Sequence, residues 1–180
     1  KSDMVVPFSM LLNLAAVANA EGKEQLWGFI QRYAPEASAE THPDLDAAAG
    51  YAVAYYNDFV KPEKTYRAPT DQERAALADM AAALRDPALA RQMIETKNAA
   101  MGKDDPVAEL DYSSAEDLQS IVFAVGKNHG FEPLRDWFGA IYEVLLGATQ
   151  GPRFGGFIAL YGVDETANLI DEALGGALIN

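Results

Sequence analysis

The sequence predicts an all-α fold of about eight to ten helices, with no sheet. Apolar side chains recur at three- and four-residue spacing through most of the chain, as they do along one face of a helix. Capping patterns or prolines precede many of these segments, and glycines follow several of them. No segment shows the alternation of β-branched and polar residues that is typical of a strand.

The 180 residues, 49% of them hydrophobic, are enough to bury a sizeable core. Residues 1–7 are expected to form a linker. The chain starts without methionine or an apolar leader, which indicates a piece of a longer protein. The helical domain is expected to span 8–180, either as one body or as two subdomains, 8–112 and 113–180. The absence of cysteine excludes disulfides and thiolate chemistry.

Three helices are expected in the first third of the chain. Ser9 is a candidate N-cap for a first helix over 10–19. A second amphipathic pattern covers 23–34, after a break at glycine. Pro43 stands at the first position of a third helix, which is expected to reach Val60.

The middle of the chain begins with a proline-bounded loop over 61–70. Thr70 and Glu73 form a capping box that opens the next helix. A weaker helix is expected after Pro87, and 102–111 is acidic and irregular.

The remaining helices are expected to begin at a capping box or a proline and to end at a glycine. Ser113 with Glu116 is a second capping box. Proline and glycine then delimit one helix that opens at Pro133 and a short one that opens at Pro152. The last helix starts near Asp164.

The net charge of −13 argues against non-specific binding to nucleic acid, so an RNA contact has to come from a local patch. The segment 121–162 is the one long stretch that is not acidic, because Lys127, Arg135 and Arg153 balance its three carboxylates. No run of about 18 apolar residues is present, so no membrane span is expected.

Two stretches resemble a known family. VPFSMLLNLAAVANAEGKEQLWGFIQRYAP over 6–35 and LLGATQGPRFGGFIALYGVDETANLIDEAL over 145–174 are similar to the C-terminal region of class I lysyl-tRNA synthetases. The resemblance implies a helical anticodon-binding domain from a cytoplasmic enzyme. Its partners would be the anticodon stem-loop of the lysine tRNA and the enzyme's own N-terminal catalytic domain, with no DNA and no membrane.

The catalytic signatures of that family, a HIGH-type histidine pair and a KMSKS-type loop, do not occur in this sequence. The resemblance therefore implies that ATP, Mg and the lysine chemistry belong to an upstream catalytic domain. The fragment itself is expected to hold no cofactor and to bind without catalysing. The two histidines and the adjacent acidic pairs match no metal or catalytic motif, so no metal site is expected.

Candidate RNA contacts fall in two places, because phosphates favour Lys, Arg and free amides at a helix start, and unpaired bases favour aromatic rings. The first surrounds the ATQGPRFGG loop and its neighbouring turn: Lys127, His129, Arg135, Gln150, Arg153 and Phe154. The second is the 61–70 loop with Lys61, Lys64 and Arg67.

Each candidate has a structural alternative. The glycines of the GPRFGG turn also suit a tight helix corner in which Arg153 caps a carbonyl and Phe154 packs in the core. The 61–70 loop also suits a solvated connection. At the level of function, the alternatives are a glutamyl-tRNA synthetase-like anticodon domain and a helical protein-interaction module, which the acidic composition favours.

Overall fold

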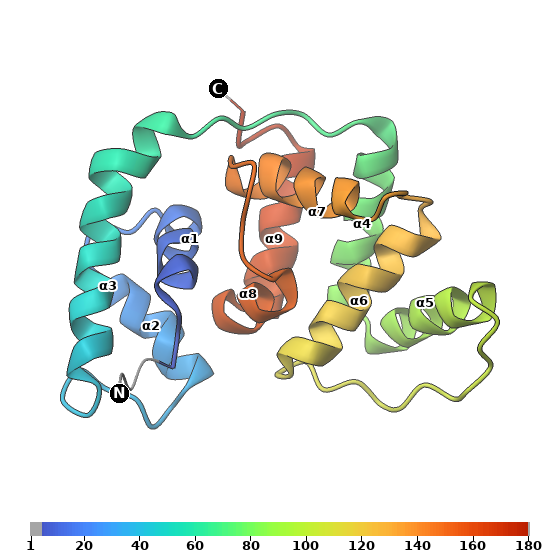
Figure 1. Ribbon diagram of the computed structural model, residues 1–180, viewed down its shortest axis with the longest axis horizontal. Coiled ribbons are helices and arrows are strands. Elements are labelled where there is room, and N and C mark those ends of the chain that lie inside the picture. Colours follow the sequence, from blue (N-terminus) through green and yellow to red (C-terminus); the bar gives the residue numbers. More distant parts are fainter. Residues whose placement is uncertain (1–4, 180) are drawn as a thin grey trace. The chain divides into compact units, whose positions relative to one another are not determined.

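The computed structural model describes residues 5–179, and within them it contains nine α-helices and no strand (Figure 1). The predicted all-α class is therefore confirmed. The chain divides into two compact units, Lys1–Thr65 and Tyr66–Asn180. The sequence allowed a division after residue 112, whereas the structure places 66–112 in the second unit. Residues 1–4 of the expected linker lie outside the described part. Val6, which belongs to the same expected linker, is buried, with 2% of its surface exposed.

The first unit holds three helices: α1 (Phe8–Ala18), α2 (Lys23–Tyr33) and α3 (Pro43–Tyr55). α3 contacts both α1 and α2, and it buries Leu45, Ala49, Ala52 and Val53. The helix continues as a π-helical turn over Tyr56–Val60 and a 3₁₀ turn over Lys61–Glu63. The helical path thus reaches Val60 as predicted, although the α-helix itself ends at Tyr55 and the 3₁₀ turn runs on to Glu63.

A polar junction joins α2 to α3. The Lys23 Nζ donates to Asp46 Oδ2 at 2.8 Å, and the Trp27 Nε1 donates to Asp46 Oδ1 at 2.9 Å. These two hydrogen bonds, of which the one from Lys23 has the larger effect, lower the pKa of Asp46.

The predicted start of the first helix is off by two residues, because α1 begins at Phe8 after Pro7 and Ser9 is already helical.

The second unit holds six helices, in which α4 packs on α9, α6 on α8 and α5 on α6. Their bounds are α4 (Asp71–Arg85), α5 (Pro87–Ala100), α6 (Ala115–Asn128), α7 (Arg135–Ile141), α8 (Phe154–Tyr161) and α9 (Val163–Leu174). Trp137 is fully buried and donates from Nε1 to the Val122 carbonyl at 2.9 Å, which ties α7 to α6. A π-helical turn over Tyr142–Leu146 extends α7.

Helix starts in this unit test the capping predictions. Thr70 and Glu73 form the predicted capping box at the start of α4. At α6 the prediction is wrong by one residue, since Ser114 accepts from the Asp117 amide at 3.2 Å. Ser113 lies one residue before the cap, and its hydroxyl donates to Asp111 Oδ1 at 2.6 Å. α5 begins at Pro87, where the sequence predicts a helix, and α7 begins two residues after Pro133.

Candidate nucleic-acid interface

The GPRFGG turn lies between the π-helical turn and α8, and its glycines serve packing. A Cβ on Gly155 would lie 2.6 Å from the Gln119 amide nitrogen and closer still to the Ala115 carbonyl oxygen. A Cβ on Gly151 would lie 2.5 Å from the Tyr142 ring. The Tyr142 hydroxyl donates to the Pro152 carbonyl at 2.7 Å. The tight corner considered above is therefore present at these two glycines.

Two of the predicted contact residues have opposite surroundings. Phe154 is 0% exposed and stacks on Phe157 with 5.4 Å between ring centroids, so a base cannot reach its ring in this structure. Arg153 is exposed at the N-cap position of α8. Within residues 5–179 no hydrogen bond or ion pair engages its guanidinium, so it does not cap a carbonyl. Gln150 is exposed in the preceding loop.

Arg153 lies at the edge of a groove of about 500 Å³ formed by α5, α6, α7 and the start of α8. We call it the Phe123 groove; it is lined by Lys97, Glu116, Gln119, Ser120, Phe123, Leu134, Phe138 and Arg153. The Phe123 and Phe138 rings are partly exposed. The ammonium of Lys97 lies 5.2 Å from the Phe123 ring centroid, and that of Lys127 lies 5.8 Å from it. The structure thus brings Lys127 and Arg153 toward one aromatic site.

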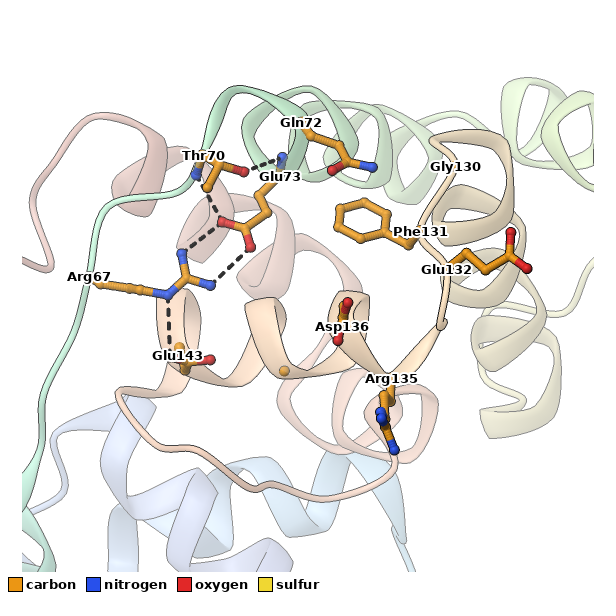
Figure 2. A pocket seen from close by; sticks show the side chains of 11 residues that line it. Arg67, Thr70, Gln72, Glu73, Gly130, Phe131, Glu132, Arg135, Asp136 and Glu143 are labelled. Carbon is orange, nitrogen blue, oxygen red and sulfur yellow. Dashed lines mark hydrogen bonds and ion pairs between the residues drawn. The ribbon is translucent and has the colours of Figure 1, made fainter.

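Two other candidates, Arg67 and Arg135, line a different hollow of about 440 Å³ (Figure 2). Figure 2 shows the Arg67 guanidinium pointing at Glu73 and Glu143, whereas Arg135 lies on the other rim and points away from them. Arg67 Nη1 is 2.7 Å from Glu73 Oε1, and its Nε is 3.3 Å from Glu143 Oε1. The hydrogen bond from Arg67 is the main reason that the pKa of Glu73 is lowered.

This hollow is poorly suited to a phosphate. Its lining contains two arginines and four carboxylates, those of Glu73, Glu132, Asp136 and Glu143. Arg67 is already paired with two of them. An anionic ligand would meet an excess of negative charge, so the Arg67 prediction gains no support from its surroundings.

His129 is also engaged within the protein. Its Nε2 lies 2.5 Å from Asp79 Oδ2, and its carbonyl accepts from Gln72 Nε2 at 2.8 Å. The pair joins the end of α6 to α4. The hydrogen bond with Asp79 gives His129 a structural role between these two helices. Contact between His129 and RNA stays a prediction.

Lys61 and Lys64 belong to the first unit, whereas Arg67 belongs to the second. The predicted 61–70 cluster therefore spans the boundary between two units instead of forming one surface within either. Lys61 is exposed, and Lys64 lies with its ammonium 6.0 Å from the Tyr56 ring centroid. Burial lowers the pKa of Lys64 to about 8.

The lowered pKa of Lys64 predicts that the first unit becomes more stable as pH rises. Between the folded pKa of about 8 and the ordinary 10.5, the unfolded chain binds a proton that the folded chain lacks, so stability increases with pH. From pH 7.5 to 9.5 we expect a gain of about 1–2 kcal/mol in unfolding free energy. Urea unfolding of wild type and Lys64→Met at the two pH values measures it. If the unfolding free energy of Lys64→Met rose with pH as much as that of wild type, Lys64 would not be the source of the pH dependence.

Of the residues that line the Phe123 groove, the sequence predicted Arg153 alone, and it missed the lysine and the two phenylalanines that form its aromatic site. Lys97 lies in a segment, 85–112, that carried no resemblance, and Phe123 and Phe138 fit apolar helical faces. The available signal was the four-residue spacing of Phe123 and Lys127, which places a cation beside a ring on one helix face.

Comparisons with known proteins identify relatives of the whole chain. It is 59% identical over 179 residues to a lysine–tRNA ligase of Roseobacter denitrificans, a match covering 99% of this chain and 30% of the relative. Lysine–tRNA ligases of Rickettsia bellii and Rickettsia conorii are 40% and 38% identical over 169 residues, which is 94% of this chain and 28% of theirs. The chain is homologous to the C-terminal part of these ligases and spans about 30% of their length.

No family model and no solved structure matches the chain. In the part of the chain that the structure describes, no group of three or more His, Asp or Glu side chains is placed to hold a metal ion. None of the helices over 5–179 is both long and apolar enough to cross a membrane.

Proposed function

We propose that this chain is the part of a class I lysine–tRNA ligase that binds the anticodon arm of the lysine tRNA. The homology to lysine–tRNA ligases over nearly all of its length supports this function. It favours the lysine enzyme over the glutamyl alternative, because the relatives are lysine–tRNA ligases.

One structural observation carries the RNA-binding part of the proposal. In a chain of net charge −13, the second unit gathers Lys97, Lys127 and Arg153 around one partly exposed phenylalanine ring. Single-stranded RNA offers phosphates that attract cations and unstacked bases that stack on aromatic rings. An anticodon loop supplies both over a few nucleotides.

In this proposal, this chain and the remainder of the ligase have different tasks. The chain binds and orients the anticodon arm, which positions the acceptor end at a distant site. Lysine activation, with ATP and Mg, takes place in the remainder of the ligase, which is the second partner of this chain, in the cytoplasm. A wrong base is rejected because it leaves polar groups of the interface unpaired.

Replacing Arg153 with alanine tests the proposal. We expect the affinity for the lysine anticodon stem-loop to fall by roughly 1–3 kcal/mol if the guanidinium reads or stacks on a base. If it contacts only phosphate, affinity falls about equally for all anticodons, and the log-affinity versus log-salt slope shrinks by about 0.7. Titrations with lysine and non-cognate stem-loops at two salt concentrations separate these outcomes.

Arg91→Ala is the matched control, since Arg91 is half exposed on α5 beside Glu95 and away from the groove. Its affinity should equal that of wild type. If a folded Arg153→Ala chain binds every stem-loop as tightly as wild type, Arg153 does not contact the RNA.

A protein-interaction module is the second candidate function, and one surface of the first unit favours it. Tyr51, Tyr55 and Phe59 follow one another along α3 and its extension, with neighbouring ring centroids 6.0 and 5.2 Å apart. They are 62%, 36% and 64% exposed. Exposed apolar stripes of this kind occur at protein interfaces. A chain of this function would bind none of the stem-loops.

A further inference from the structure

We infer that the Phe123 groove holds a single unpaired nucleobase, stacked on the Phe123 ring, while Lys97, Lys127 and Arg153 contact the flanking phosphates. The inference deepens the proposed function and rests on it. It adds Lys97, Phe123 and Phe138 to the interface and assigns the ring and the cations different tasks.

The dimensions and the wall of the groove suit a base. Its volume of about 500 Å³ lies within the range of roughly 300–1,000 Å³ that small-ligand sites occupy. Phe123 on α6, Phe138 on α7 and Leu134 before α7 provide apolar surface. The first two rings are partly exposed, so a flat aromatic ligand can reach them. Fully buried Phe154 cannot take that part.

The two ammonium groups near Phe123 are available to phosphate. Lys97 and Lys127 contact the ring as cation–π partners, and among the described residues neither forms an ion pair with a carboxylate. An exposed cation–π contact is weak compared with a charge-assisted bond to phosphate. Both lysine side chains can therefore leave the ring for the RNA backbone, and the freed face takes the base.

The polar lining distinguishes a base from a bare phosphate. Gln119 Oε1 accepts from the Gly155 amide at 2.6 Å, which leaves its Nε2 group as a donor. Glu116 contributes a carboxylate acceptor one helical turn away on α6. A base edge offers both donors and acceptors, and the groove has both. A phosphate offers acceptors only, and Glu116 would repel it.

The closing experiment measures the binding of the lysine anticodon stem-loop to the chain with two substitutions. Phe123→Leu keeps apolar volume and removes the ring, and Lys97→Gln removes one charge. We expect Phe123→Leu to weaken binding about tenfold without changing the salt slope, because stacking releases no counterions. Lys97→Gln should reduce the slope by about 0.7. Phe123→Tyr, which restores a ring, should restore affinity.

Stem-loops with one abasic position in the loop identify the stacked base. At the position that occupies the groove, the abasic RNA should bind wild type and Phe123→Leu equally, because there is no base left to stack. Arg91→Gln on α5 and Phe59→Leu in the first unit are the charge and ring controls, and both should bind like wild type.

Three results would overturn the inference in different ways. If Arg153→Ala weakens binding but folded Phe123→Leu and Lys97→Gln bind like wild type, the proposed function stands and the groove does not hold a base. If the wild-type chain binds no stem-loop, the inference and the proposed function both fall. A Phe123→Leu effect that persists undiminished at every abasic position would reduce the ring to a structural support.

Discussion

Replacing Glu73 with alanine is expected to lower the unfolding free energy of the second unit by about 3 kcal/mol. Glu73 accepts from Arg67 at 2.7 and 2.9 Å and from the Thr70 amide at 2.8 Å. Its side chain is 11% exposed, whereas that of Arg67 is 35% exposed. Losing the capping-box bond from the Thr70 amide costs about 1 kcal/mol, and losing the charge-assisted hydrogen bonds from Arg67 costs about 1.5–3 kcal/mol. The two losses sum to about 2.5–4 kcal/mol, and the partial exposure of Arg67 places the expected loss in the lower half of that range.

Urea unfolding followed by Trp137 fluorescence measures this loss. A Trp27→Phe background makes the signal specific to the second unit, since the chain has two tryptophans. Glu95→Ala is the control, because its contact with Arg91 is 3.9 Å long and half exposed, and it should change stability by less than about 0.5 kcal/mol. If Glu73→Ala lowered the unfolding free energy no more than Glu95→Ala does, the hydrogen bonds between Arg67 and Glu73 would contribute little to stability.

The pH dependence of the same pair has a definite sign. The folded pKa of Glu73 is lowered, so its contribution is present above the ordinary value of 4.5 and disappears as pH falls through the folded pKa. The unfolding free energy of wild type should therefore exceed that of Glu73→Gln by the largest amount at pH 7, and this difference should shrink as pH falls below 4.5.

Replacing Gly155 with alanine is expected to destabilise the second unit by about 3 kcal/mol. The new Cβ would meet the Gln119 amide nitrogen at 2.6 Å and the Ala115 carbonyl, which are backbone atoms of α6 and its N-terminal end and cannot rotate aside. α8 would have to move off α6, which overpacks the contact and stretches the hydrogen bond from the Gly155 amide to Gln119. The same Trp137 fluorescence assay measures the change.

Gly28→Ala is the matched control for this substitution. Gly28 lies within α2, and nothing lies within 4 Å of a Cβ placed there. The alanine should stabilise the first unit by about 0.5–1 kcal/mol, since it removes the cost of glycine in a helix. Unchanged or raised stability in Gly155→Ala would mean that α6 and α8 pack more loosely than the structure shows.

Local sequence determined the helices and most of their boundaries. The capping box of Thr70 and Glu73 is a contact between residues three apart, so it is legible in the sequence and present in the structure. The helix starts at Pro43 and Pro87 were predictable for the same reason. The cap of α6 is one residue off because two adjacent serines suit the position, and the structure uses Ser114 while Ser113 bonds to Asp111.

Tertiary structure alone decided which charged and aromatic residues meet. Arg67 counted as a free cation in the sequence, but folding pairs it with Glu73 and also with Glu143, which is 76 residues away. Phe154 and Phe123 look alike in the sequence, but only Phe123 keeps its ring partly exposed. Lys97 reaches that ring from α5, across the interface with α6. Helical periodicity is set by neighbours three and four residues apart, whereas a binding groove is set by side chains that only packing brings together.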